Sequence, residues 1–408
     1  MPPALGDGSG QDKDGTGHGH YDHSHHDEVV QFGSGRSARG RWLPRIALAC
    51  LVLAAIVAVA VRGTPQHARH AATTRPLPPV RVIGAGHPLL DVSRGWALFA
   101  RGPDDLLRIQ LAQGKIAVTY VPPLQSANPN VAFVIGAHEA VIRSTDLVPG
   151  YVVPDSGQAR VLTGPLAGDG PLIPGPPSTQ AAWIMSGSPA SPSLSLVTLT
   201  GRRVGPTIRF QPGGPQLPAT AVSDGRGYVL VTAGGFSVYD AGPGWDRPVP
   251  GTVVAVGRES WLVISCDPLY RHCHNEVVDI ASGARRELPG PIAGFPYDEF
   301  SWPPIGVIAP DGSTAAVVEG GSDGPLTVHL INLRSGTNRN LRIVLGKSDG
   351  NVLAGTGLSD QSMAWSPDSR WLFVAAADGK LVVVDARTGR AEHLQVTLPP
   401  VTQVAVGA

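Results

Sequence analysis

The sequence predicts an all-β protein, a β-propeller of seven blades, with six or eight blades as the alternatives. First, a glycine at a tight turn follows a strand-like run and recurs at intervals of roughly 40 to 53 residues, the repeat length of propeller blades. Second, the strand-like runs are short and apolar at nearly every position, as burial of both faces between neighbouring blades requires. The recurring glycines are Gly114, Gly157, Gly201, Gly242, Gly283, Gly336 and Gly389.

The last repeat is the clearest. Within residues 363–390, three apolar runs are separated by Pro-Asp-Ser, Asp-Gly and Thr-Gly turns. Pro presets the backbone dihedral of a turn, Asp accepts hydrogen bonds from nearby amides, and Gly tolerates positive φ. We therefore expect units of four strands each, over Pro88 to Pro122, Asn130 to Leu166, Gln180 to Phe210, Ala219 to Pro250, Thr252 to Leu288, Ile305 to Leu345 and Ser362 to Leu398.

The chain before the repeats divides into three segments. Residues 1–41 lack an apolar period and are rich in Gly, Asp, Ser and His, which predicts a disordered tail. Residues 42–62 contain an apolar run of about 16 residues behind Trp42, close to the usual spanning length of about 20. Residues 63–79 are rich in Pro and Thr and predict a semi-rigid stalk, and residues 80–408 form the propeller.

The apolar run predicts one transmembrane helix or signal anchor. Arginines flank it on both sides, so we assign the orientation from the domain that must be exported: the N-terminus is cytoplasmic and the propeller lies outside the cell membrane. The alternative is a cleaved signal peptide, since Ala58-Val-Ala60 resembles a small-x-small site, and a secreted propeller. Two further strand-like pieces, Val80–Ile83 and Val401–Val406, are predicted to meet in one blade that joins the two ends of the propeller.

The cysteines fit an exported domain. Cys50 lies in the apolar segment, while Cys266 and Cys273 bound one hairpin connection, so we predict a disulfide between them. His272 and His274 flank Cys273 and keep a metal site open as an alternative, although a usual zinc site needs four ligands. The His-rich tail is a second metal candidate, because dense neutral imidazoles chelate metals weakly without a fold. Its ligands would be His18, His20, His23, His25 and His26.

Composition and motifs narrow the function classes. The formal net charge is zero, only 16% of residues are charged and no basic stripe is present, so nucleic acid is not expected as a partner. No cofactor is predicted. The sequence contains no His-Glu-x-x-His and no Cys-x-x-Cys, and its two Gly-x-Ser-x-Gly spellings do not precede a helix-like segment. Asp311 and Asp368 stand in turns, where a structural role is expected.

The last two units resemble a known superfamily. Ser-Pro-Asp-Ser-Arg at 366–370 with the strand and turn of 381–389 resembles the WD-repeat, TolB-like and YVTN-type β-propellers, and the chain would be a membrane-anchored bacterial member. Residues 309–313 with 330–336 repeat the same pattern. The resemblance covers roughly residues 80–408, and the Gly-His and Trp-Asp pairing of true WD repeats does not recur. This superfamily implies a binding platform more often than a catalyst, and it leaves the ligand open.

The predicted binding face comes from loop geometry. In a propeller, connections between second and third strands and between successive blades open on one face, and here that face receives four long connections of the fifth to seventh units. Exposed aromatics with flanking charges are typical of interfaces, although aromatics also fill blade junctions. The predicted binding residues are Tyr270, Arg271, Phe295, Tyr297, Asp298, Glu299, Phe300, Trp302 and Asp323.

These observations favour a membrane-anchored extracytoplasmic module that binds or scaffolds a protein or cell-envelope component. One alternative is a propeller-fold hydrolase or lyase acting on an envelope polymer, which would need acids or histidines converging on one site. The other is a metal-responsive protein that uses the His-rich tail.

Overall fold

The structure is a computed structural model in which residues 74–408 form one compact unit. It describes residues 77–407 apart from 125–130, 145–148, 169, 189–190, 210–219, 234–236, 243–244, 250, 268–271, 291–305, 321–323 and 348–360. The predicted tail, membrane segment and most of the stalk lie outside the described residues. Among the helices of the described part, none is long and apolar enough to cross a membrane.

The described residues form an all-β fold with short 3-10 turns at Leu111–Gln113, Gly164–Ala167 and Pro177–Thr179. The first sheet has the order β1-β4-β3-β2-β29. Its strands are β1 (Arg81–Gly84), β2 (Ala97–Arg101), β3 (Asp105–Gln110), β4 (Lys115–Tyr120) and β29 (Gln403–Gly407). The second sheet runs β5 (Val131–Ile135), β6 (Glu139–Ser144), β7 (Tyr151–Pro154) and β8 (Arg160–Val161).

The third and fourth sheets are also antiparallel and four-stranded. The third holds β9 (Leu172–Pro174), β10 (Ala181–Ser188), β11 (Ser191–Thr198) and β12 (Arg203–Arg209). The fourth holds β13 (Thr220–Ser223), β14 (Val229–Ala233), β15 (Ser237–Gly242) and β16 (Trp245–Val249). The sixth sheet holds β25 (Met363–Trp365), β26 (Trp371–Ala375), β27 (Leu381–Asp385) and β28 (Arg390–His393).

The fifth sheet has eight strands in the order β20-β19-β18-β17-β21-β22-β23-β24. It consists of two antiparallel groups of four, joined by the parallel pairing of Ala255 with Gly306 and of Val256 with Val307. The first group is β17 (Thr252–Val256), β18 (Ser260–Cys266), β19 (Cys273–Asp279) and β20 (Arg285–Leu288). The second group is β21 (Gly306–Ile308), β22 (Thr314–Glu319), β23 (Pro325–Asn332) and β24 (Asn338–Lys347).

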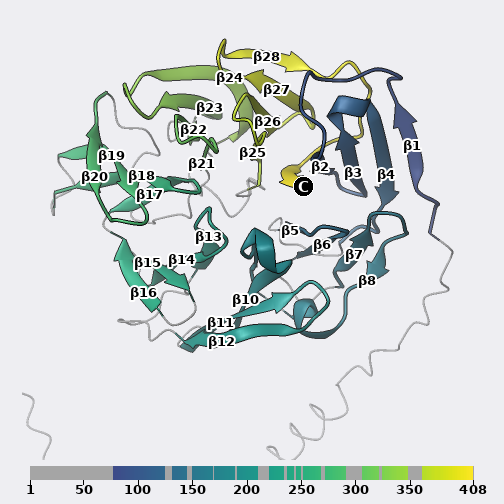
Figure 1. Ribbon diagram of the computed structural model, residues 1–408, viewed down its shortest axis with the longest axis horizontal. Coiled ribbons are helices and arrows are strands. Elements are labelled where there is room, and N and C mark those ends of the chain that lie inside the picture. The colour runs from purple at the N-terminus through teal and green to yellow at the C-terminus, as the bar shows by residue number, and fades with distance from the viewer. Residues whose placement is uncertain are drawn as a thin grey trace, which may run out of the picture. The chain divides into compact units, whose positions relative to one another are not determined.

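The sheets follow one another around a ring, in the arrangement of a β-propeller (Figure 1). The innermost strands β29, β5, β9 and β13 contact one another in turn, as do β17, β21, β25 and β29. A cluster that contains Leu230 and Val263 joins the fourth sheet to the fifth. Because each sheet buries both faces against its neighbours, its strands are apolar at successive positions, as the sequence pattern predicted.

Both ends of the propeller lie in the first sheet, which confirms the prediction that the two terminal strands share a blade. They occupy opposite edges of it: β29 is innermost and pairs with β2, whereas β1 is outermost and pairs with β4. In Figure 1 the C-terminal end accordingly lies beside β2. The last strand of the chain therefore closes the ring against the first repeat.

Six of the seven recurring glycines fall between the third and fourth strands of a repeat, and Gly242 is the last residue of a third strand, β15. Gly336 shows why one of them must be glycine: its φ is 72°, and a Cβ would lie 1.6 Å from the carbonyl oxygen of Pro289. The predicted start of the third unit at Gln180 is wrong, because β9 precedes it and pairs with β10. This strand has three residues between glycines and prolines, so it carries too little apolar pattern to be recognised.

Candidate functional site

Four connections that begin in the fifth sheet leave from one edge of the ring, namely those after β18, β20, β22 and β24. β17 and β21 run parallel, and each following strand of their groups is antiparallel to the one before. The ends of β18, β20, β22 and β24 therefore lie at the same edge. We call this edge the loop face, and we define it by the ends of β18 and β22 and the starts of β19 and β23.

The binding residues predicted from the sequence belong to the connections of this loop face. Tyr270 and Arg271 belong to the connection from β18 to β19, residues 295–302 to that from β20 to β21, and Asp323 to that from β22 to β23. All of these residues lie outside the described residues, namely Tyr270, Arg271, Phe295, Tyr297, Asp298, Glu299, Phe300, Trp302 and Asp323. The strands on either side of each connection are described. Their side chains hold the strand ends in place.

A disulfide joins Cys266, the last residue of β18, to Cys273, the first residue of β19. The two residues are cross-strand neighbours with a Cα–Cα distance of 4.0 Å. The bond closes the base of the connection that carries Tyr270 and Arg271. Next to it, His272 Nδ1 lies 2.8 Å from Asp267 Oδ2, a pair that is largely exposed on the histidine side.

A charged cluster lies on the same two strands, around Glu276. Ser265 Oγ donates to Glu276 Oε2 at 2.8 Å, His274 Nε2 lies 3.1 Å from Glu276 Oε1, and Arg285 from β20 forms an ion pair with the same carboxylate. Burial alone would raise the pKa of Glu276, but the hydrogen bonds from Ser265, His274 and Arg285 outweigh it and lower the pKa. Glu276 therefore stays ionised and holds β18, β19 and β20 together.

A second cluster surrounds His329 on β23. Its Nδ1 lies 3.0 Å from Glu319 Oε2 and 2.9 Å from Asn338 Oδ1, and its Nε2 lies 3.1 Å from Thr327 Oγ1. Thr327 Oγ1 donates to the Glu319 carbonyl oxygen at 3.3 Å and can therefore accept from the ring. Asn338 Nδ2 donates to Glu319 Oε1 at 2.8 Å. Both ring nitrogens face acceptors, an arrangement that suits the imidazolium form.

The pKa of His329 follows from these contacts. Burial would lower the pKa, and the hydrogen bonds with Glu319 and Asn338 together with the charge of Glu319 overcome this effect and raise it. Glu319 is the last residue of β22, so the cluster lies where the connection with Asp323 begins. His329 and Glu319 were not predicted as site residues, because the residues of the cluster come from three strands and no local motif links them.

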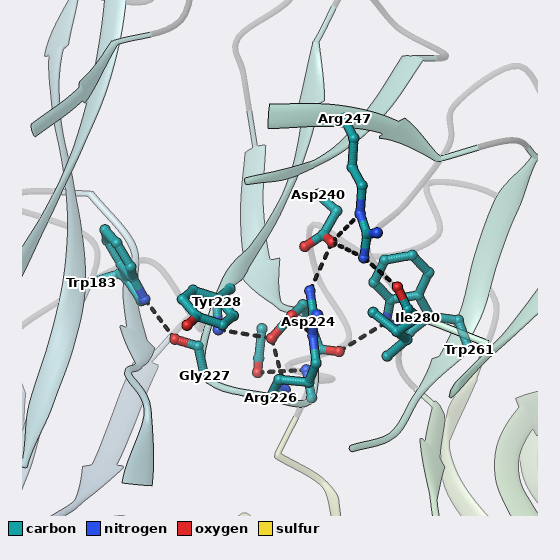
Figure 2. A network of polar contacts seen from close by, with 11 residues as sticks. Trp183, Asp224, Arg226, Gly227, Tyr228, Asp240, Arg247, Trp261 and Ile280 are labelled. Atoms are coloured by element: carbon teal, nitrogen blue, oxygen red, sulfur yellow. Dashed lines mark hydrogen bonds and ion pairs between the residues drawn. The ribbon is translucent and has the colours of Figure 1, made fainter. Parts of the chain in front are cut away.

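A third polar network lies between the fourth and fifth sheets (Figure 2). Asp224, in the turn between β13 and β14, accepts from Arg226 Nε at 2.7 Å, and Arg226 Nη2 donates to Asp240 Oδ2 at 2.7 Å. Asp240 also accepts from Arg247 Nε at 2.9 Å, and Arg247 Nη2 donates to the carbonyl of Ile280 at 2.6 Å. Both carboxylates are fully buried, and burial raises the pKa of Asp240 in spite of the two arginines.

Two tryptophans tie this network to the neighbouring strands. Trp261 Nε1 donates to the Asp224 carbonyl at 2.9 Å, and Trp183 Nε1 donates to the Gly227 carbonyl at 2.7 Å (Figure 2). Trp183 belongs to the third sheet and Trp261 to the fifth, so one turn of the fourth sheet is bonded to both neighbours. The aspartates and arginines of the network alternate and neutralise each other. We therefore interpret the network as a structural contact between blades and not as a ligand site.

The sixth sheet contains a looser version of the same arrangement. Asp368 accepts in its turn from Ser366 Oγ at 2.5 Å and from the Arg370 amide at 3.2 Å, while Arg370 Nε lies 3.8 Å from Asp385 Oδ2. Asp311 likewise accepts from the Ser313 amide at 3.0 Å. The expected turn role of Asp311 and Asp368 is confirmed. The partner of Arg370 was not predicted. It is Asp385, at the end of β27, which is not close to the turn in the sequence.

The alternative of a metal site beside Cys273 is not supported, because its sulfur is bonded to Cys266. In the part of the chain that the structure describes, no group of three or more His, Cys, Asp and Glu side chains could hold a metal ion. The predicted ligands of the tail lie outside the described residues, namely His18, His20, His23, His25 and His26.

Comparisons with known proteins give the fold its context. No protein-family model and no curated protein matches the chain. Similar solved structures include TolB from Acinetobacter baumannii, at 14% identity over 78% of this chain and 67% of that one, with a TM-score of 0.43. AztD from Citrobacter koseri has 14% identity over 75% of this chain and 83% of that one, with a TM-score of 0.42.

A protein from Lactobacillus plantarum is also similar, at 13% identity over 78% of this chain and 100% of that one, with a TM-score of 0.45. At these identities and scores the likeness assigns neither a family nor a function to this chain. The fold assignment itself rests on the strand pairing described above.

Proposed function

We propose that the chain is a membrane-anchored, extracytoplasmic β-propeller of seven blades that binds a protein or a cell-envelope component through its loop face. The blade count rests on counting each antiparallel group of four in the fifth sheet as one blade, since only two parallel residue pairs join the groups. The positions of the recurring glycines support the same count, with one glycine for each repeat.

The observation that carries the binding role is the shared edge. The connections after β18, β20, β22 and β24 all begin at the loop face, and their sequences hold the aromatic and charged residues of 295–302 together with Tyr270, Arg271 and Asp323. The strand ends from which these connections leave are held by the disulfide and by the clusters around Glu276 and His329. Rigid strand ends that carry loops of variable sequence are the usual construction of a recognition surface.

The extracytoplasmic location rests on two features. The disulfide between Cys266 and Cys273 suits an oxidising compartment, because cytosolic proteins rarely keep such bonds. The apolar run behind Trp42 provides the anchor that would keep the exported domain at the cell membrane. Reporter fusions test this: a periplasmic-type reporter after residue 79 should be active, and the same reporter after residue 41 should be inactive. Activity in both or neither would reject the orientation.

Binding is tested with the full-length chain, extracted from membranes of the source cells together with its partners. The test variant carries Tyr297→Ala, Phe300→Ala and Trp302→Ala. The control variant carries Arg334→Ala and Arg387→Ala, two exposed arginines in third-to-fourth-strand turns at the opposite edge. A partner that is recovered with the wild type and the control but lost with the test variant supports the site. Equal recovery with all three proteins rejects it.

A further inference from the structure

Arg101 occupies a special position where the ring closes. It is the last residue of β2 and pairs with Gln403 of β29, the innermost strand of the first sheet. Side chains alternate along a strand, so Arg101 shares a face with Phe99, which packs against Phe133 of the second sheet. Arg101 therefore points toward the junction of the first and second sheets. The connection after β2 corresponds to the connection after β18, since each joins the second and third strands counted from the middle of the ring.

Neutral groups hold the guanidinium in place. Arg101 Nη1 donates to Gln403 Oε1 at 3.0 Å and to Thr402 Oγ1 at 3.4 Å. Gln403 Nε2 in turn donates to the Val131 carbonyl at 2.6 Å and lies 3.4 Å from Gln361 Oε1. The Gln403 amide thus orients the arginine, and it is held in turn by Gln361, which precedes β25, and by the backbone of β5.

Several other partly buried arginines pair with carboxylates, whereas Arg143, only 2% exposed, donates to backbone carbonyls such as that of Leu166. Arg108 lies 2.7 Å from Asp155, Arg226 and Arg247 share Asp240, and Arg285 pairs with Glu276. Arg101 has no ion pair within the described residues. Partial burial weakens the solvation of the guanidinium, and its two neutral acceptors do not supply a counter-charge. Burial lowers the pKa of Arg101 to about 10.

We propose that Arg101 is an anion-binding residue, which takes an oxyanion group of a ligand at the junction of the first and second sheets. With Nη1 committed to Gln403 and Thr402, the Nε and Nη2 donors make no hydrogen bond to the described residues. These two nitrogens form the edge of a guanidinium that binds two oxygens of a carboxylate or a phosphate side by side. The ligand supplies the negative charge that the described chain does not.

The site uses none of the residues proposed for binding at the loop face. Its failure would leave the proposed function untouched, and the loss of the aromatic residues in 295–302 would leave this site intact. The two ideas are therefore distinguished by their variants.

The test measures binding of sodium acetate and of sodium phosphate to the full-length chain by titration calorimetry, with chloride added to constant ionic strength. The variant Arg101→Gln keeps hydrogen-bonding capacity and removes the charge. The matched control is Arg94→Gln, which changes an exposed arginine. We expect wild type and control to bind one of the anions, and Arg101→Gln to bind it about tenfold or more weakly, since hydrogen bonds to charged groups are worth about 1.5 to 3 kcal/mol.

The two anions separate the possible ligands. Binding of acetate alone supports a carboxylate ligand, and binding of phosphate supports a phosphorylated one. Should Arg101→Gln fail to fold, Arg101→Lys keeps the charge and removes the planar fork, and weaker binding by this variant supports the site. Failure of both anions to bind the wild type, or equal binding by the wild type and the folded variant, overturns the proposal.

Discussion

His329 Nδ1 lies 3.0 Å from Glu319 Oε2, and this pair joins two strands of the fifth sheet at the base of the loop face. The side chains are 13% and 18% exposed, so the pair is largely removed from water. Thr327 completes the surroundings of the ring on the Nε2 side at 3.1 Å. The stability of this part of the sheet therefore depends on whether His329 carries a proton.

The first prediction is a dependence of stability on pH. The pKa of His329 is raised above its ordinary value of 6.5, so the folded protein binds a proton that the unfolded chain has begun to release. The contribution is fully present below the unfolded pKa and is lost as pH rises through the folded pKa. Urea unfolding from about pH 5.5 to about pH 8.5 should show this loss for the wild type and not for His329→Gln.

The matched control for this prediction is His138→Gln, because the His138 side chain is 93% exposed. Its pH profile should follow the wild type. If His329→Gln also follows the wild type, His329 does not titrate in the way its contacts imply.

The second prediction concerns Gly336. An alanine there would adopt a φ of 72° and place its Cβ 1.6 Å from the Pro289 carbonyl oxygen, so the backbone must move. Gly312 has a φ of 69°, and a Cβ added there would have nothing within 4 Å. Gly312→Ala should therefore cost about 1 kcal/mol of unfolding free energy from backbone strain alone, and Gly336→Ala about 3 kcal/mol or more. Equal costs would show that the close approach is absent.

The third prediction concerns the closing strand. Val404 of β29 is 1% exposed, and Val82 of β1, in the same sheet, is 57% exposed. Val404→Ala should lower the unfolding free energy by about 2 kcal/mol, while Val82→Ala should change it by less than about 0.5 kcal/mol. Denaturant unfolding of the two variants checks this difference. A larger effect at Val82 would contradict the assignment of β29 as the closing strand.

The fourth prediction concerns the disulfide, which closes a short loop between residues seven positions apart. The chain-entropy model gives a loop of this size about 2 to 3 kcal/mol of stabilisation. The double variant Cys266→Ala/Cys273→Ala should lose about this amount in equilibrium unfolding, and Cys50→Ala should lose none. A double variant as stable as the wild type would contradict a structural role for the bond.

The sequence predicted the architecture well because propeller repeats leave local marks. Turn glycines such as Gly336 and turn aspartates such as Asp311 stand at fixed offsets from apolar runs, and the structure confirms their positions. The strand β9 escaped prediction because three residues between glycines and prolines have no period to detect. Both outcomes have the same cause. Prediction depends on apolar periodicity and on turn residues, which are local in the sequence, and a strand as short as β9 shows too little of the periodicity.

The polar clusters of the structure could not be predicted in this way. Glu319, His329 and Asn338 come from three strands, and Arg226, Asp240 and Arg247 meet through a fold that no spacing in the sequence expresses. Arg101 is recognisable only by the carboxylate that the described residues do not provide, a property of the folded surroundings. The aromatic residues of 295–302 were found from loop length and composition, and their role stays a prediction.

The most direct test of the binding face is photo-crosslinking in living source cells with the full-length chain. A photoreactive phenylalanine is placed at position 297, 300 or 302, and, as controls, at the exposed positions Asp311 and Arg387 at the opposite edge. We predict one common adduct from the first three positions and none from the controls. Adducts only from the controls, or no adduct from positions 297, 300 and 302, would contradict a binding module that uses its loop face.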